Sequence, residues 1–213
     1  MKKNIFSLVL VCGLIGSLFG ESSKVPDPLI SGLADIRFNV TRIESESTNK
    51  VSELVALAKQ ADHWVVAYPE RPEPKIWKAI VLAARAKYVG ISALALVDEA
   101  RALLDKAIAI DPKANEAAGL NALGMLYHKV PIWPISFGSN KKARSYFDQA
   151  LTASSNLDTN FRMGEFLLDM GEKEKGLSHL KTALALPGRP GRPEDAWKRK
   201  SIEALIQKHK DLK

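Results

Sequence analysis

The sequence contains a single cysteine, Cys12, among its 213 residues. One thiol excludes a disulfide framework and every zinc or iron–sulfur site that needs several cysteines. Aromatic residues make up only 7% of the chain, and no run of four or more residues shows the apolar–polar alternation of a half-buried strand. Because β-sheet folds draw on aromatic and β-branched residues, this alanine-rich composition predicts an all-α fold.

Signatures of catalysis are also missing from the sequence. It has no HExxH zinc motif, no GxSxG nucleophile elbow and no Walker phosphate loop. The four histidines are His63, His128, His179 and His209, and no two of them are spaced closely enough to chelate a metal. We therefore expect a protein that is not an enzyme and that binds neither a metal nor a cofactor.

The first twenty residues have the pattern of a secretory signal peptide. Lys2 and Lys3 precede an apolar run of about fifteen residues, which is shorter than the roughly twenty that a transmembrane helix needs. We expect residues 1–20 to be removed and the chain to be exported to the periplasm. A lipoprotein anchored through Cys12 is the weaker alternative, because Val11 is bulky where lipoprotein processing requires a small residue.

Beyond this peptide, residues 21–48 predict an extended leader with at most one short helix around Leu29–Phe38, because they contain two prolines and a polar cluster at Glu44–Thr48. From Asn49 onward, apolar residues recur at helical spacing. A first helix is expected before Tyr68. Further helices are predicted at 75–89, 94–110, 114–129, 140–154, 159–170, 173–186 and 194–209.

The net charge of +7 is concentrated at the two ends of the chain. Two lysines belong to the signal peptide, and residues 187–213 hold eight basic and four acidic residues, so the body between them is nearly neutral. This distribution predicts a solvated basic tail and no nucleic-acid partner. Peripheral contact of the tail with an acidic partner or an anionic membrane remains open.

Three units share one spacing of small and large residues. The first has Trp77, Ile80 and Val81 followed by Ala100, Leu104 and Ala107; the second has Leu120, Leu123, Gly124 and Tyr127 followed by Ala143, Phe147 and Ala150; the third has Met163, Gly164 and Leu167 followed by Gly176, Leu180 and Ala183. Glycine and alanine at these positions let two helices approach closely, and the large residues fill the space beside them.

This pattern resembles the tetratricopeptide repeat (TPR), a pair of antiparallel helices. The resemblance implies a right-handed α-solenoid over residues 49–213, with residues 194–209 as its C-terminal capping helix. The spacing departs from the family in the first two units. Val81 and Ala100 are 19 residues apart, as are Gly124 and Ala143, against 12 in the third unit, so each of these two units carries an insertion.

The resemblance further implies a concave groove lined by first helices, which binds a protein or peptide partner. The groove residues carried over to this chain are Lys78, Arg85, Asn121, His128, Phe161, Glu165 and Asp169. For each of them the alternative is an ordinary solvated position on a helix. The oligomeric state stays open.

The second insertion, Val130–Gly138, combines two prolines with five large apolar residues. It is similar to a loop in secreted bacterial repeat proteins, including the T component of tripartite periplasmic transporters. That similarity implies an alternative function, in which a transport accessory protein holds a small apolar ligand or docks to a solute-binding protein. Trp133 and Phe137 either plug the helix array or form a lip that grips a partner or ligand.

Overall fold

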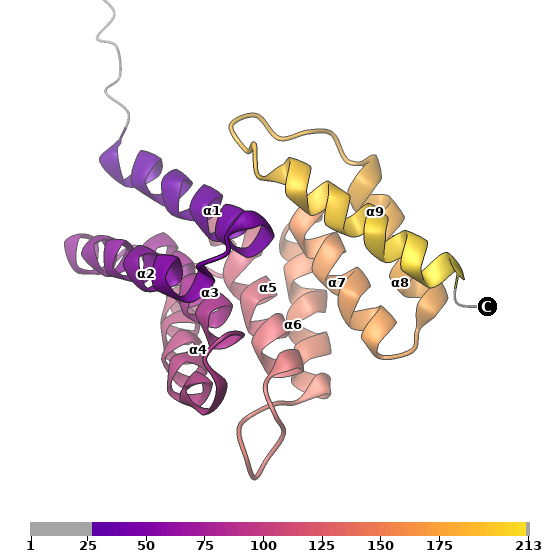
Figure 1. Ribbon diagram of the computed structural model, residues 1–213, viewed down its shortest axis with the longest axis horizontal. Coiled ribbons are helices and arrows are strands. Elements are labelled where there is room, and N and C mark those ends of the chain that lie inside the picture. Colours follow the sequence, from indigo (N-terminus) through magenta and orange to yellow (C-terminus); the bar gives the residue numbers. More distant parts are fainter. Residues whose placement is uncertain (1–26, 212–213) are drawn as a thin grey trace, which may run out of the picture.

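The structure is a computed structural model that describes residues 27–211. Within this range it contains nine α-helices, one short 3₁₀-helix (η1, Gly90–Ser92) and no strand, which confirms the predicted all-α fold (Figure 1). The helices are α1 (Pro28–Glu46), α2 (Lys50–Ala67), α3 (Pro72–Ala86), α4 (Ala93–Ile110), α5 (Ala114–Lys129), α6 (Asn140–Ala153), α7 (Leu157–Asp169), α8 (Lys173–Ala185) and α9 (Asp195–Asp211).

The first helix corrects the expected extended leader in its described part, residues 27–48, where the short helix expected around Leu29–Phe38 belongs to a longer one. Residues 28–46 are helical throughout, because Pro28 occupies the first helical position and the Asp27 carboxylate accepts the Leu29 N–H at 2.9 Å. Its buried face consists of Leu29, Leu33, Ile36, Val40 and Ile43. The predicted signal peptide, with Cys12, lies outside the described residues.

The other helices agree with the sequence prediction to within about three residues at each end. The largest difference is at α3, which was expected to begin at 75 and begins at Pro72. Pro72 and Pro74 both lie in its first turn, where proline costs no hydrogen bond. In α5 the first turn is left-handed, with φ between 49° and 62° from Asn115 to Ala117, and the regular helix follows it.

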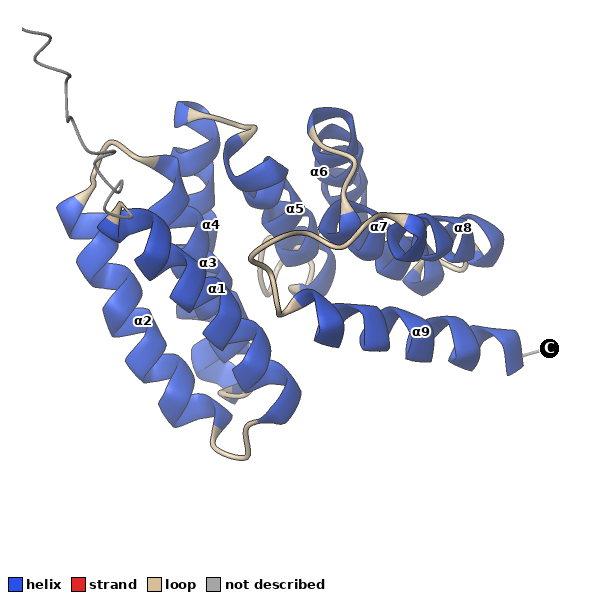
Figure 2. Ribbon diagram, turned by 90° about the horizontal axis from the view of Figure 1, so that it is seen from above, coloured by secondary structure: helices blue, strands red, loops and turns tan. Residues whose placement is uncertain are grey.

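Each helix packs mainly on a neighbour along the chain, most closely in the pairs α3–α4, α5–α6 and α7–α8. The odd-numbered helices α1, α3, α5 and α7 also contact one another in this order and so form an inner row. The last helix, α9, packs on α8 and reaches back to α1, and Figure 2 shows it running alongside α7 and α8 with its first turns nearest α1. The inner row and α9 therefore face a common space.

Small residues set the distance between paired helices. A Cβ atom on Gly124 of α5 would lie 2.7 Å from the Phe147 ring of α6. A Cβ on Gly164 of α7 would lie 2.6 Å from Leu180 of α8, and one on Gly176 would lie 3.0 Å from the Gly164 carbonyl oxygen. These glycines are therefore required for close helix contact, as the sequence spacing predicted.

The first and last helices of the described chain meet where the C-terminal half of α1 lies against the start of α9. Arg37 forms an ion pair with Glu194, whose side chain is fully buried, and donates to the Gly191 carbonyl at 2.9 Å. The Trp197 indole N–H donates to Glu46 at 2.6 Å, and the ring packs 5.4 Å from that of Phe38. Helix α1 is thus an integral part of the fold.

Candidate functional site

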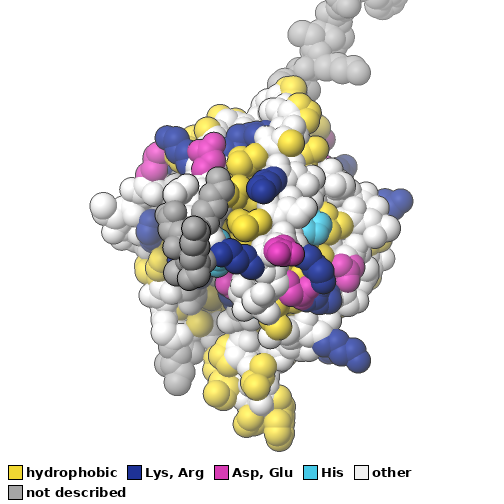
Figure 3. Space-filling model, turned by 90° about the vertical axis from the view of Figure 1, so that its right-hand side faces the viewer, with side chains coloured by type: hydrophobic (Ala, Val, Ile, Leu, Met, Phe, Trp, Pro, Cys, Tyr) yellow, Lys and Arg dark blue, Asp and Glu magenta, His cyan; other side chains and the backbone are white. Residues whose placement is uncertain are grey.

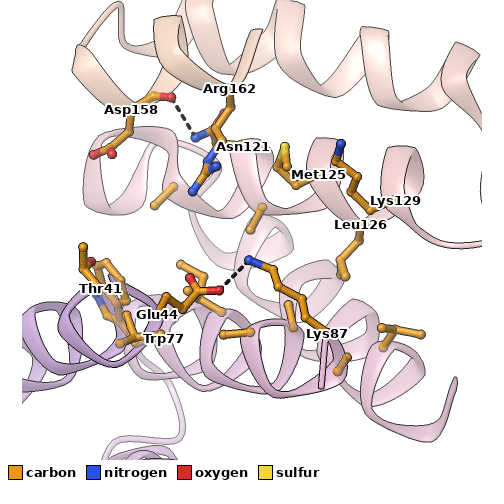
Figure 4. A pocket seen from close by; sticks show the side chains of 18 of the residues that line it. Thr41, Glu44, Trp77, Lys87, Asn121, Met125, Leu126, Lys129, Asp158 and Arg162 are labelled. Carbon is orange, nitrogen blue, oxygen red and sulfur yellow. Dashed lines mark hydrogen bonds and ion pairs between the residues drawn. The ribbon is translucent and has the colours of Figure 1, made fainter. Parts of the chain in front are cut away.

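A cavity of about 320 Å³ lies between the inner row of helices and α9. Its walls come from α1, α3, α4, α5 and α7, and from Arg192 and Lys198 at the C-terminal end of the chain (Figure 4). This volume falls within the range of small-molecule pockets, roughly 300–1,000 Å³. Because the start of α9 returns to α1 beside it, the cavity is bounded by elements far apart in sequence.

Most of the cavity wall is apolar. The larger contributors are Trp77, Ile80, Leu94, Val97, Met125 and Leu126, and the smaller ones include Ala83, Ala86, Ala118 and Ala122. The alanines come from the facing sides of α3 and α5, where larger side chains would fill the space between the helices. A ligand with an apolar body would lose water from both its own surface and this wall on binding.

One end of the cavity is lined by a network of charged residues. Lys198 of α9 lies 2.6 Å from Asp158 of α7, and Arg189 donates to the same carboxylate at 2.8 Å. Burial disfavours the Asp158 charge, but the two cations outweigh it and hold the pKa of this carboxyl well below its usual range. Arg192 pairs with Glu116 at 2.7 Å.

On the α1–α3 side of the cavity, Lys87, directly after α3, pairs with Glu44 of α1 (Figure 4). Lys129 of α5 lines the facing side and forms an ion pair with Asp169, which lies outside the lining. The lining residues thus place charged groups beside an apolar wall. This arrangement suits a molecule with an apolar body and polar groups at its periphery.

Asn121 on α5 is the one uncharged amide of the predicted groove that lines the cavity. The residue is 8% exposed, and its Nδ2 donates weakly to the Asp158 carbonyl at 3.4 Å. Its Oδ1 is buried and has no hydrogen-bond partner. A buried acceptor without a partner is costly, so this atom is suited to receive a hydrogen bond from a bound molecule.

The two groove residues predicted on α3, Lys78 and Arg85, do not line the cavity. Lys78 bridges neighbouring helices through Asp62 and Glu99, both at 2.6 Å. Burial disfavours the Lys78 charge, but the two carboxylates outweigh it and raise the pKa of Lys78. Arg85 does not line the cavity either, and its Nε is buried without a hydrogen-bond partner.

Of the predicted residues on α7 and at the end of α5, Phe161, His128 and Asp169 make contacts between helices, and Glu165 pairs within α7. Phe161 is 6% exposed and belongs to the apolar cluster between α7, α8 and α9. Glu165 pairs with Arg162 at 2.6 Å. His128 lies 2.9 Å from Asp169, so these two predicted residues contact each other outside the cavity.

The proline-rich loop separates its two aromatic residues. Phe137 and Tyr127 pack edge to face at 5.2 Å between ring centres, and the Arg101 guanidinium lies over the Phe137 ring, 4.2 Å from its centre. Trp133 is 82% exposed. The two alternatives for this loop therefore apply to different residues, since Phe137 plugs the helix array and Trp133 projects from it.

Sequence reasoning missed most of the residues that line the cavity, including Trp77, Lys87, Lys129, Arg162 and Lys198. For the lining residues on α5, a signal is present in the sequence. Positions 118, 122, 125 and 129 follow helical spacing and define one face, to which Asn121 also belongs. The contribution of α9 has no such signal, because it depends on how the chain returns to α1.

Comparison with models of known protein families finds no match, and no curated protein matches the chain either. Among the helices described between residues 27 and 211, none is long and apolar enough to cross a membrane. In the same range no three His, Cys, Asp or Glu side chains are grouped so as to hold a metal ion.

Proposed function

We propose that the protein is a binding protein, not an enzyme, whose interior cavity holds a small ligand with a mostly apolar body. The unpartnered Oδ1 of Asn121, buried beside Asp158 at the charged end of the cavity, is the observation that carries this proposal. It favours a ligand that presents a hydrogen-bond donor, such as a hydroxyl or amide group, to this end of the cavity.

This proposal favours a small ligand over a protein or peptide partner. Only Asn121 of the seven predicted groove residues lines the cavity, and most of the other six, namely Lys78, His128, Phe161 and Asp169, are engaged by neighbouring helices. The contact of α1 with α9 also restricts the space that an extended peptide would need. A peptide remains the second candidate, because its backbone N–H groups would also satisfy Asn121.

The wider setting belongs to the same proposal. The repeat spacing supports a right-handed TPR-like solenoid capped by α9, and the N-terminal pattern supports export to the periplasm. Such a protein would capture an apolar molecule outside the cytoplasm and pass it to a transport system. Docking to a solute-binding protein would provide that transfer.

The test is to fill the cavity without disturbing the surface. In Ala122→Phe the new ring would occupy the space between α3 and α5, whereas Ala95→Phe places the same ring at an exposed position of α4. The probe is anilinonaphthalene sulfonate, an apolar anion whose fluorescence rises in apolar sites, and extracts of the purified protein are examined by mass spectrometry for co-purifying molecules. We expect Ala122→Phe to lose probe binding and the co-purifying molecule, and Ala95→Phe to keep both.

Equal probe binding by the two variants would contradict the proposal. A co-purifying peptide, lost in Ala122→Phe, would instead support the second candidate. Thermal unfolding of both variants shows whether a loss of binding reflects a filled cavity or an unfolded protein.

A further inference from the structure

The tip of the loop between α5 and α6 is an exposed group of apolar side chains. All five residues from Pro131 to Ile135 are exposed, and the exposed fractions reach 69% for Ile132, 82% for Trp133 and 67% for Ile135. The loop projects from the lower end of the molecule in Figure 1, and Figure 3 shows hydrophobic side chains gathered there. The only polar side-chain group of this apolar tip is the Trp133 indole N–H.

The base of the loop holds the tip away from the protein core. The Gly138 N–H donates to the Pro131 carbonyl at 2.9 Å, and the Ser139 N–H donates to the Tyr127 carbonyl at 2.7 Å. A Cβ on Gly138 would lie 2.0 Å from the Val130 carbonyl oxygen, so only glycine fits this close approach. With Phe137 packed against Tyr127, the apolar tip is a built projection, and its side chains are not a displaced part of the core.

Basic residues flank the apolar tip. Between Glu116 and Asp148 the chain contains no acidic residue, while four basic residues fall in this interval. Lys129 pairs with Asp169 and Arg144 with Glu172, which leaves Lys141 and Lys142. Lys141 and Lys142 are exposed, and in residues 27–211 neither forms an ion pair. Lys142 lies instead over the Tyr127 ring, 5.2 Å from its centre, beside the base of the loop.

We propose that the apolar tip inserts into the interface of an anionic lipid bilayer and that the lysines behind it contact lipid phosphates. A convex apolar projection needs a partner that deforms around it, and a bilayer does so without a preformed pocket. Tryptophan is favoured at membrane interfaces because its ring is apolar and its N–H remains hydrated. Apolar insertion combined with charge attraction is the way that peripheral proteins bind anionic membranes. This proposal rests on the loop alone and is independent of the cavity.

Quenching of tryptophan fluorescence by bromine-labelled lipid tests the insertion directly. The full chain and its Trp133→Phe variant are mixed with vesicles of phosphatidylcholine containing phosphatidylglycerol, with and without bromine on the acyl chains. We expect quenching in the original chain that is largely lost in Trp133→Phe, because Phe keeps the apolar character and removes the reporter. Because the two chains differ only at Trp133, the loss of quenching reports on the apolar tip even if another part of the chain touches the vesicle.

A second measurement changes the strength of insertion. In a variant carrying Ile132→Ser and Ile135→Ser, quenching of Trp133 should require a lipid concentration about tenfold higher or more. The control is Val66→Ser on α2. Val66 is a similarly exposed apolar residue, at 79%, that lies outside the loop. Its substitution should therefore leave the dependence of quenching on lipid concentration unchanged. Lys141→Gln combined with Lys142→Gln should weaken quenching at low salt and have less effect at high salt.

Equal quenching of the original chain and of Trp133→Phe would overturn the proposal, as would an effect of Val66→Ser that matches that of the serine pair. The same conclusion follows if the serine pair lowers the mass measured by light scattering without altering quenching, because the apolar tip would then bind a second copy of the chain. Because the substituted side chains are exposed, the melting temperatures of all variants should match that of the original chain, and circular dichroism verifies this.

Discussion

Lys198 of α9 lies 2.6 Å from Asp158 in the first turn of α7. Arg189, in the segment before α9, reaches the same carboxylate at 2.8 Å and also contacts Asp195 at 2.6 Å and Glu116 at 2.9 Å. Asp158 therefore connects the last helix, and the turn before it, to the inner row. Its charge state controls how firmly this end of the cavity is held.

The pKa of Asp158 gives a prediction with a definite sign. Because Lys198 and Arg189 hold this pKa below its value in the unfolded chain, the stabilisation is complete above about pH 4 and is lost as the pH falls further. Asp158→Asn should lower the free energy of unfolding by about 2 kcal/mol at pH 7 and flatten its decline below pH 4. Urea unfolding between pH 3 and pH 7 measures both effects.

A matched control for that experiment is Asp148→Asn on the exposed side of α6. Asp148 forms no ion pair with another residue in the range 27–211, so its substitution should change stability by less than about 0.5 kcal/mol. If both variants show the same pH dependence, the network around Asp158 does not stabilise the fold as argued.

Two glycines at helix contacts are expected to differ in how a substitution to alanine changes the free energy of unfolding. Gly164→Ala should lower the free energy of unfolding by about 2 kcal/mol, because its Cβ would overlap Leu180 at 2.6 Å. Gly119→Ala places a Cβ 3.4 Å from Ile108, an ordinary contact, and should be neutral or stabilising by up to about 1 kcal/mol through helix propensity. Denaturant unfolding of both variants compares the same substitution in two helices. The close packing of α7 on α8 would be disproved by equal stability.

The contribution of α1 to the core can be tested by replacing two isoleucines that lie on its opposite faces. Ile36 is 1% exposed and Ile30 is 65% exposed. Ile36→Ala should cost about 2–4 kcal/mol, whereas Ile30→Ala should cost less than about 0.5 kcal/mol. In a protein of this size, the first change corresponds to a fall of several degrees in melting temperature. A negligible effect of Ile36→Ala on thermal unfolding would mean that α1 is not part of the core.

Asn121 is predicted to lower the stability of the ligand-free protein and to strengthen the binding of the ligand. Asn121→Leu replaces an amide whose Oδ1 is buried and unpartnered with an apolar group of similar size. The ligand-free protein should gain about 1 kcal/mol of stability, because this desolvation cost disappears. Binding of the co-purifying ligand should weaken at least severalfold, as measured by isothermal titration. Unchanged affinity would show that Asn121 does not contact the ligand.

The helices of this protein were predictable because their signals are local. Apolar spacing and the residues that end a helix placed each of α2 to α9 to within about three residues. The one error of type concerned α1, where only a short helix around Leu29–Phe38 was expected, and Pro28 and the polar cluster at Glu44–Thr48 were taken as signs of extended chain. At the first position of a helix proline is favourable, so the regular spacing of Leu29, Leu33 and Ile36 was the stronger signal.

The candidate site was much less predictable, because it depends on contacts between distant segments. Lys78 has the character of a groove residue in sequence, yet Asp62 and Glu99 engage it from two other helices. Asn121 was found because its helix face lines the inner row, whereas Lys198 lines the cavity only through the return of α9 toward α1. No spacing rule within one helix contains that information.

The contact of α1 with α9 changes how the array of helices comes apart. In an open helical array the terminal units have one neighbour each and unfold first and independently. Here Trp197, in the first turn of α9, binds Glu46 and packs on Phe38 of α1, so the start of α9 cannot fray without uncovering the end of α1. The amide protons of the last turns of α1 and of the first turns of α9 should therefore lose protection together.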